Sequence, residues 1–290
     1  MLFAVSAVCG QTLSRLVGGV TANVFRITIA CTLLGLFTWL FSPGQIHAAP
    51  FRWFAFSGVL GFGLGDVALF LAYPLLGART AVLVNLCVAT VVGALADRIF
   101  LGTRLAASEM AAAALTLAGV VLAMHQKDEP FQWNAGLLLS IFSGTCGGIS
   151  LMLSRLAMGI AQEQGLEISG PAQAFQRTFG GLFVGWLAFG ILRLSLKGKP
   201  VISESARTVR LPFLILASST IGPVIGVSIM QVALQQVGSS AIISAISSTV
   251  PLMLLPISRY IDHKKPTQQA IWGSFLSVGG VAAMAYFRTR

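Results

Sequence analysis

Asp66 is the one acidic residue well inside a long apolar stretch, where it follows Gly63 and Gly65. If that stretch crosses a membrane, a charge in its middle costs at least about 2.5–3.5 kcal/mol, so the side chain should face a cavity or a partner. A carboxylate there could accept a coupling proton or hold a cationic solute. It could also be a fixed counter-ion for an arginine, and the sequence leaves both uses open.

Gly63, Gly65 and Asp66 also form the GxGD pattern of intramembrane aspartyl proteases. Peptide hydrolysis of that kind needs two carboxylates that share a proton, one acting as acid and the other as base. The nearest other acid, Asp97, ends a later apolar stretch beside Arg98, and no Tyr-Asp partner is present. We therefore expect no catalytic residue and no enzyme.

Arg26 and Arg177 lie about one turn inside two other apolar stretches, at corresponding places. They could pair with an anionic solute or lipid, but arginines in such places more often extend to the lipid headgroups or fix a helix end. Five basic residues are accordingly expected to be structural or gating charges: Arg15, Arg26, Arg98, Arg177 and Arg259.

Uncharged polar residues inside the apolar stretches are the expected contacts of a solute. With Asp66, the candidate substrate or coupling residues are Gln11, Asn85, Ser150, Gln231, Ser247 and Ser248. None of the four cysteines is in a CxxC spacing, and the three histidines fall between the apolar stretches. We therefore expect neither a metal site nor a cofactor.

The composition indicates where these residues reside. The chain has 290 residues, of which 56% are hydrophobic and only 10% charged, with a net charge of +10. Soluble domains are about 25% charged. The basic residues occur singly between apolar runs, which argues against a nucleic-acid partner. These features exclude a disordered chain, a disulfide-stapled module and an ordinary soluble enzyme, and they indicate a multi-pass protein of the lipid bilayer.

A helix needs about 20 mostly apolar residues to cross the hydrocarbon layer. Ten stretches meet this need: 1–19, 22–42, 53–73, 79–100, 106–125, 134–154, 171–193, 211–235, 238–258 and 268–287. No stretch has the alternating pattern of a transmembrane β-barrel. The first lacks the basic leader and cleavage box of a signal peptide, so we interpret it as a true span. The predicted class is an all-α membrane protein with ten transmembrane helices.

The chain also repeats itself at an offset of 161 residues. The pairs that align are Gly61 with Gly222, Gly65 with Gly226, Gly77 with Gly238, and Arg98 with Arg259. The offset predicts two five-helix repeats, 1–125 and 134–290, joined by a connector over 126–133. Because five crossings is an odd number, the second repeat should be inverted in the membrane, as in many transporters. Asp66 aligns with Val227, so the second repeat has no matching carboxylate.

Small residues at helical spacing let helix backbones approach closely. We expect this packing role for Gly61, Gly65, Gly147, Gly222 and Gly226. The same thin faces could also border a cavity.

Short motifs occur in order along the whole chain. They are Gly10 and Arg15, Arg26, Gly61 to Asp66 with Phe70, Leu76-Gly77-Ala78, Leu101 to Leu105, Gly119-Val120, Pro251, Pro256, Lys265-Pro266, Gly273 and Gly280-Val281. As a set they resemble the ten-helix EamA type of the drug/metabolite transporter superfamily. Thr103 and Thr90 depart from that pattern, since the family has glutamate and proline there.

The resemblance implies a secondary transporter that moves a small organic metabolite, amino acid-like solute or drug by alternating access. It also implies export, a bacterial inner membrane and cytoplasmic termini, whereas the basic residues of the connectors favour the opposite orientation. No nucleotide-binding motif is present, which favours coupling to a proton gradient or facilitated exchange over ATP hydrolysis. The alternative is a non-transporting scaffold or lipid-associated assembly subunit. The sequence does not indicate the oligomeric state.

Overall fold

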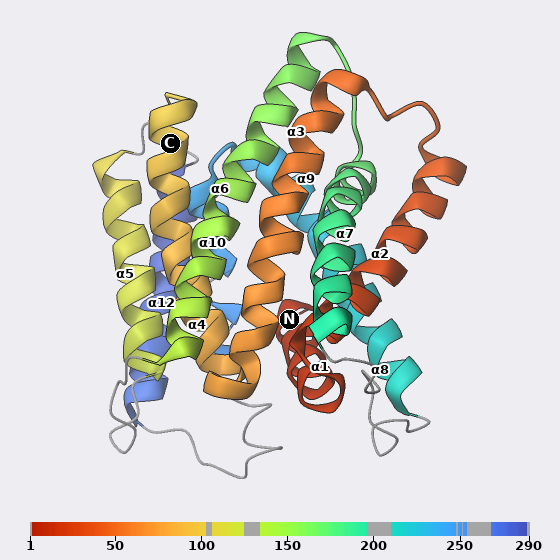
Figure 1. The fold of residues 1–290 in the computed structure, drawn as a ribbon. Coiled ribbons are helices and arrows are strands. Elements are labelled where there is room, and N and C mark those ends of the chain that lie inside the picture. The colour runs from red at the N-terminus through yellow and green to blue at the C-terminus, as the bar shows by residue number, and fades with distance from the viewer. Residues whose placement is uncertain are drawn as a thin grey trace.

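The computed structural model describes residues 2–102, 106–124, 134–195, 210–247, 249–250, 252–253 and 268–288. Over these ranges the chain forms helices and no strand, in agreement with the predicted all-α class (Figure 1). The elements are α1 (Leu2–Val17), α2 (Gly19–Phe41), α3 (Ala48–Gly58), η1 (Val59–Gly65), α4 (Asp66–Phe100), α5 (Ala107–Met124), α6 (Ala135–Glu163), α7 (Gly170–Ser195), α8 (Arg210–Ser219), η3 (Thr220–Gly226), α9 (Val227–Val237), α10 (Ser240–Ser247) and α12 (Gln268–Arg288).

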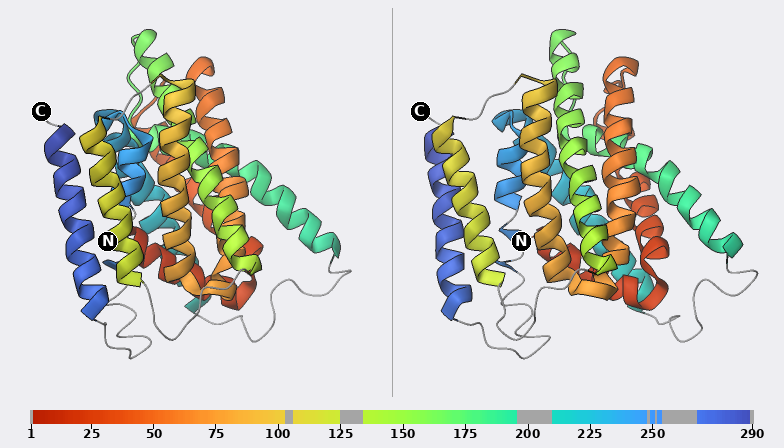
Figure 2. Two further views of the ribbon diagram at one scale, coloured as in Figure 1. Left: turned by 90° about the vertical axis from the view of Figure 1, so that its left-hand side faces the viewer. Right: turned by 60° about the vertical axis from the view of Figure 1, so that its left-hand side comes forward.

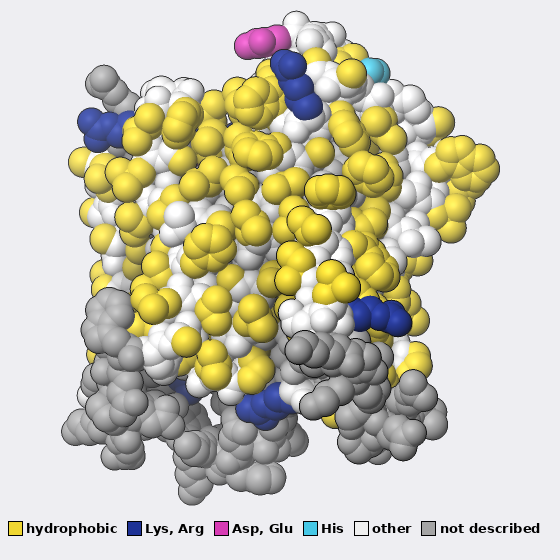
Figure 3. Space-filling view, viewed as in Figure 1, with side chains coloured by type: hydrophobic (Ala, Val, Ile, Leu, Met, Phe, Trp, Pro, Cys, Tyr) yellow, Lys and Arg dark blue, Asp and Glu magenta, His cyan; other side chains and the backbone are white. Residues whose placement is uncertain are grey.

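Several of these helices are long and apolar enough to cross a membrane. By length and composition, five stretches qualify within the described ranges: Gly19–Phe41, Ala48–Phe100, Ala135–Glu163, Gly170–Ser195 and Leu211–Val237. The face shown in Figure 3 is covered with hydrophobic side chains, and its few visible charged groups lie toward the upper and lower ends. Large side chains such as Trp39 and Phe183 are about three-quarters exposed, at 73% and 74%. A surface of this kind suits contact with lipid rather than water.

The stretch Ala48–Phe100 is not one straight helix. Gly77 has φ 76° and ψ 153°, a conformation that essentially only glycine adopts, and Pro74 lies three residues before it. The chain turns back at this point in Figure 2. The stretch therefore holds both the third and the fourth predicted helices. The predicted stretch 238–258 is seen only in part, as α10 and four residues after it.

Two segments are wider than α-helix. η1 and η3 are π-helices of seven residues each, and they begin 161 residues apart. The sequence predicts regular α-helical spacing of Gly61 and Gly65. This prediction is wrong, because both residues lie in η1, where a π-helical turn contains more residues than an α-helical turn. π-helical turns are rare and are often found at functional sites.

Glycine is needed in these segments because their backbones lie against other helices. A Cβ atom added at Gly61 would come within 2.5 Å of the Ser150 hydroxyl, and one added at Gly222 would overlap the hydroxyl of Ser6. A Cβ atom added at Gly65 or at Gly226 would have neighbours at about 3.0 to 3.2 Å, so those neighbours would have to move by a few tenths of an ångström.

The expected packing role does not hold at Gly147. A Cβ atom there would meet only the Ala89 Cβ atom, at an ordinary 3.7 Å, whereas Gly144 and Gly148 lie directly against the backbone of α4. Gly147 instead borders a cavity.

α5 and α12 form a separate pair at one side of the bundle (Figures 1 and 2). They meet through Gly119, which lies against the Ser277 backbone, and Gly280, which lies against Thr116. Neither helix of this pair lines the cavity.

Candidate functional site

A cavity of about 200 Å³ lies inside the bundle, between elements from both ends of the chain. Its walls come from α1, α2, η1, α4, α6, α7, η3, α9 and α10 and from Val250. The polar side chains among its lining residues are Ser6, Arg26, Asp66, Tyr73, Asn85, Ser143, Ser150, Arg177 and Ser247. Most of the remaining wall is aromatic or aliphatic, which is typical of a solute pocket with a few oriented polar groups.

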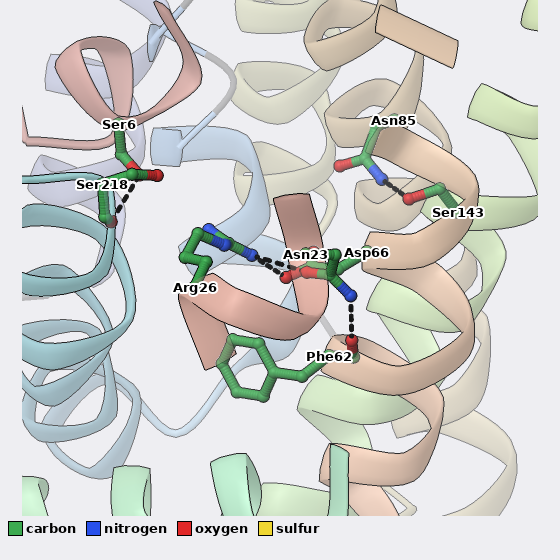
Figure 4. Close-up of polar contacts among 8 residues, drawn as sticks. All are labelled: Ser6, Asn23, Arg26, Phe62, Asp66, Asn85, Ser143 and Ser218. Carbon is green, nitrogen blue, oxygen red and sulfur yellow. Dashed lines mark hydrogen bonds and ion pairs between the residues drawn. The ribbon is translucent and has the colours of Figure 1, made fainter. Parts of the chain in front are cut away.

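The first charged group is an ion pair between α2 and α4. Arg26 is only 8% exposed, and its Nη2 atom donates to the Asp66 carboxylate and to Asn23 Oδ1, the latter at 3.4 Å (Figure 4). The guanidinium also lies over the Phe70 ring, 4.6 Å from its centroid. Asn23 in turn donates to the carbonyl of Phe62 at 3.1 Å, which ties α2 to the π-helical segment η1. Asp66 is therefore neutralised by a neighbour that is itself fixed.

The second charged group is Arg177 on α7, which is 3% exposed. Its Nη1 atom donates to Gln231 Oε1 at 2.6 Å, and its Nη2 atom donates to Ser150 Oγ at 3.0 Å. Its guanidinium lies 5.3 Å from the centroid of the Phe62 ring. In the part of the chain that the structure describes, no carboxylate lies within 4 Å of Arg177, and its Nε atom has no hydrogen-bond partner.

The surroundings of the two arginines follow one plan. Ser150 donates to the Ser57 carbonyl at 2.7 Å, and Ser6 donates to the Ser218 carbonyl at 3.3 Å. Ser57 and Ser218 are again 161 residues apart. A Cβ atom at Gly61 would lie 3.6 Å from Arg177 Nη2, and one at Gly222 would lie 3.5 Å from Arg26 Nη1. Each arginine thus lies beside one π-helical segment and one serine.

Most of the predicted solute contacts lie at this cavity. Four line it, namely Asp66, Asn85, Ser150 and Ser247. Asn85 donates to Ser143 Oγ at 2.6 Å, a contact drawn in Figure 4. Gln231 is fully buried behind the wall, where it holds Arg177. Gln11 is half-buried near the turn at Gly77 and is not among the lining residues, and Ser248 lies outside the described residues.

The predicted structural or gating charges divide into two groups. Arg15 and Arg98 are exposed, and Arg259 lies outside the described residues. Arg26 and Arg177 do not extend to the surface as expected, because each points into the cavity and has hydrogen-bond partners there.

Several polar residues of this site were not predicted from the sequence: Ser6, Tyr73 and Ser143 in the cavity wall, and Asn23 and Ser57 behind it. Asn23 carried a usable signal, since it precedes Arg26 by three residues and so shares its helix face. Asp97, the other acid considered for proteolysis, is held elsewhere, by Arg155 Nη1 at 2.7 Å and the Ser240 backbone N–H at 2.8 Å.

Comparison with known proteins agrees with this geometry. Residues 1–125 match the EamA-like transporter family. This confirms the resemblance to EamA-type members of the drug/metabolite transporter superfamily, a family of membrane transporters rather than enzymes. The match covers residues 1–125 and, together with the apolar helices, supports a multi-pass membrane protein of the drug/metabolite transporter type, for which a lipid environment and a small-molecule substrate are implied.

The fold has relatives among solved structures. One titled "Crystal structure of protein" is 14% identical to this chain, with a TM-score of 0.68, and the alignment covers 99% of this chain and 96% of that one. At this identity the likeness shows the fold alone. No curated protein matches the chain.

Proposed function

We propose that this EamA-like transporter moves one small organic solute at a time through the central cavity by alternating access between two inverted five-helix halves. The observation that carries the proposal is the cavity itself, which has charged and polar walls and draws on elements from both ends of the chain. The alternative, a non-transporting scaffold or assembly subunit, has no need for buried arginines around a hollow interior.

Three features support the inverted halves, 1–125 and 134–290 with a connector over 126–133, and their ten crossings. The π-helical segments η1 and η3 begin 161 residues apart. Ser57 and Ser218 accept matching hydrogen bonds. A third feature is the odd number of proposed crossings in the first half, five, which would turn the second half over. Two related halves of this kind can rock between outward-open and inward-open states around a fixed site.

The size of the cavity favours a small metabolite over a bulky drug. Pockets that hold drug-sized ligands measure roughly 300–1,000 Å³, and this one measures about 200 Å³. We further propose export across a bacterial inner membrane, with both termini in the cytoplasm. If a proton is coupled to transport, Asp66 is the carboxylate that would carry it, and the Arg26 ion pair would have to open for this.

Efflux from vesicles tests the proposal. Proteoliposomes are loaded with a defined mixture of amino acids, organic acids and amines, and efflux is measured by mass spectrometry with and without a pH gradient. Gly147→Leu should abolish efflux, because Gly147 borders the cavity and a Cβ atom there meets nothing closer than 3.7 Å.

The matched control is Gly159→Leu on the same helix, where a Cβ atom has nothing within 4 Å and the residue does not line the cavity. It should export as the unmodified protein does. Equal efflux from a folded Gly147→Leu variant would refute transport through this cavity.

A further inference from the structure

The cavity carries one more positive than negative group. Its charged lining residues in the described part of the chain are Arg26, Asp66 and Arg177. Arg26 and Asp66 form an ion pair and balance each other. Arg177 remains, and both of its hydrogen-bond acceptors, Gln231 and Ser150, are neutral.

A guanidinium in such a place calls for an anion. Removing a charge from water is strongly unfavourable unless a counter-charge or a full set of hydrogen bonds replaces the water. The guanidinium has five N–H donors, of which two have hydrogen-bond partners in the structure, and its Nε atom is buried without one. A carboxylate can satisfy two of the free donors at once, because its geometry matches the guanidinium fork.

Arg177 is also held in place before any solute arrives. Gln231, which accepts from Nη1, donates to Gln173 at 3.4 Å. Ser150, which accepts from Nη2, is fixed to Ser57 by hydrogen bonds in both directions, each of 2.7 Å. Fixing a binding group in advance lowers the entropy that binding must overcome.

The rest of the cavity wall indicates the chemical nature of the remainder of the solute, beyond its anionic group. Apolar side chains dominate it, among them Phe3, Leu69, Leu86, Leu151 and Met230. Asp66, the only carboxylate among the lining residues, is already paired with Arg26, so a solute's ammonium group would find no free counter-ion.

We propose that Arg177 is the anchor for the carboxylate of the transported solute, and that this solute is a small monocarboxylate with an apolar body. This inference rests on the proposed function and narrows it to one chemical class. A zwitterion or an amine of the same size fits the same walls but lacks a partner for its positive charge.

Titration calorimetry on the purified full-length transporter tests the inference with four probes that share one apolar body. They are 3-methylbutanoate, 3-methylbutanamide, 3-methylbutylamine and L-leucine, which are an anion, a neutral molecule, a cation and a zwitterion. We expect the carboxylate to bind at least about tenfold more tightly than the others. A carboxylate that binds no better than the amide or amine, or does not bind, overturns the inference.

Variants then locate the effect. Arg177→Gln should remove the preference for the carboxylate, and Arg177→Lys should keep part of it, because the charge stays while the two-pronged geometry is lost. Arg98→Gln, which removes an exposed arginine, is the control and should bind as the unmodified protein does. A preference that survives in Arg177→Gln contradicts the assignment, as does chloride or phosphate alone giving the same Arg177-dependent heat.

The vesicle experiment distinguishes this failure from failure of transport. If Gly147→Leu blocks efflux of some solute but no probe shows a preference for the carboxylate, the substrate class is wrong and transport stands. If Gly147→Leu leaves efflux unchanged, the proposed function itself is wrong.

Discussion

Arg26 and Arg177 have closely similar surroundings but different partners. Each is buried, lies over an aromatic ring and approaches a glycine of one π-helical segment. Arg26 has a carboxylate, Asp66, whereas the position 161 residues after Asp66 is Val227, which lines the same cavity. The scaffold is thus matched between the two regions and the charge is not. Two halves with the same backbone arrangement can exchange between two equivalent conformations. The single extra positive charge, which only one half has, can bind a solute whose two ends differ in charge.

The largest expected effect comes from taking the carboxylate away from Arg26. Asp66→Asn should destabilise the protein by about 3–5 kcal/mol, because breaking a buried ion pair leaves one charge uncompensated. Denaturant unfolding of the purified protein measures this. The double variant Arg26→Gln with Asp66→Asn should recover much of the loss, since it leaves no unpaired charge. If the single variant is as stable as the unmodified protein, Asp66 does not neutralise Arg26.

A second contrast concerns the two π-helical segments. Gly61→Ala should cost about 1–3 kcal/mol by overpacking, because the new methyl group meets the Ser150 hydroxyl at 2.5 Å. Since Ser150 also holds Arg177, the same variant should weaken binding of 3-methylbutanoate.

Gly222→Ala is the matched change, and it displaces Ser6, which bonds to the Ser218 carbonyl. It should cost similar stability in unfolding experiments but affect carboxylate binding less. Equal losses of binding in the two variants would contradict a special role for the Arg177 side. Adding Ser150→Ala to Gly61→Ala removes the overlap but also an acceptor of Arg177, so it should not restore binding.

The difference in charge between the surroundings of Arg26 and Arg177 can also be removed, by placing a carboxylate at position 227 beside Arg177. Val227→Asp should supply Arg177 with an internal counter-ion and lower the affinity for 3-methylbutanoate about tenfold, or roughly 1.4 kcal/mol. Val227→Asn changes shape and polarity in a similar way without the charge, and it should lose much less. Calorimetry compares the two. If Val227→Asp and Val227→Asn bind 3-methylbutanoate with equal affinity, Arg177 is not the group that binds its carboxylate.

Much of this arrangement was open to prediction from the sequence. The 161-residue offset predicted that Gly61 and Gly222 correspond, and both lie in π-helical segments of the same length. Most described helices begin and end within about five residues of the apolar runs, because the hydrocarbon thickness sets their length. The helix α6 differs, since it continues to Glu163, nine residues past the predicted end at 154. Asp66, Asn85 and Ser150 were chosen as polar residues inside such runs, and all three line the cavity.

Other features depend on contacts between distant residues and leave no local signal. In η1 the Phe62 carbonyl accepts a hydrogen bond from Asn23 of α2, and Gly61 lies against Ser150 of α6, so glycine spacing alone suggested a regular α-helix. An arginine one turn inside an apolar run can extend outward or fold inward, and the choice for Arg26 depended on Asp66, 40 residues away. Gln11 resembled the other candidates in sequence but lies beside the turn at Gly77.

The smallest expected effect is that of a substitution at Gly238, the turn that the offset pairs with the turn at Gly77. Gly238 has φ 64° and ψ 30°, the left-handed conformation that asparagine tolerates, whereas Gly77 has φ 76° and ψ 153°, which is nearly restricted to glycine. Gly238→Asn should therefore change the free energy of unfolding by only a few tenths of a kcal/mol, and Gly77→Asn should cost about 1–3 kcal/mol. Parallel unfolding of the two variants measures the difference. If the two variants lose the same free energy of unfolding, the two turns restrict the backbone to the same degree. The two proposed halves would then differ in the charges at the cavity but not in their turns.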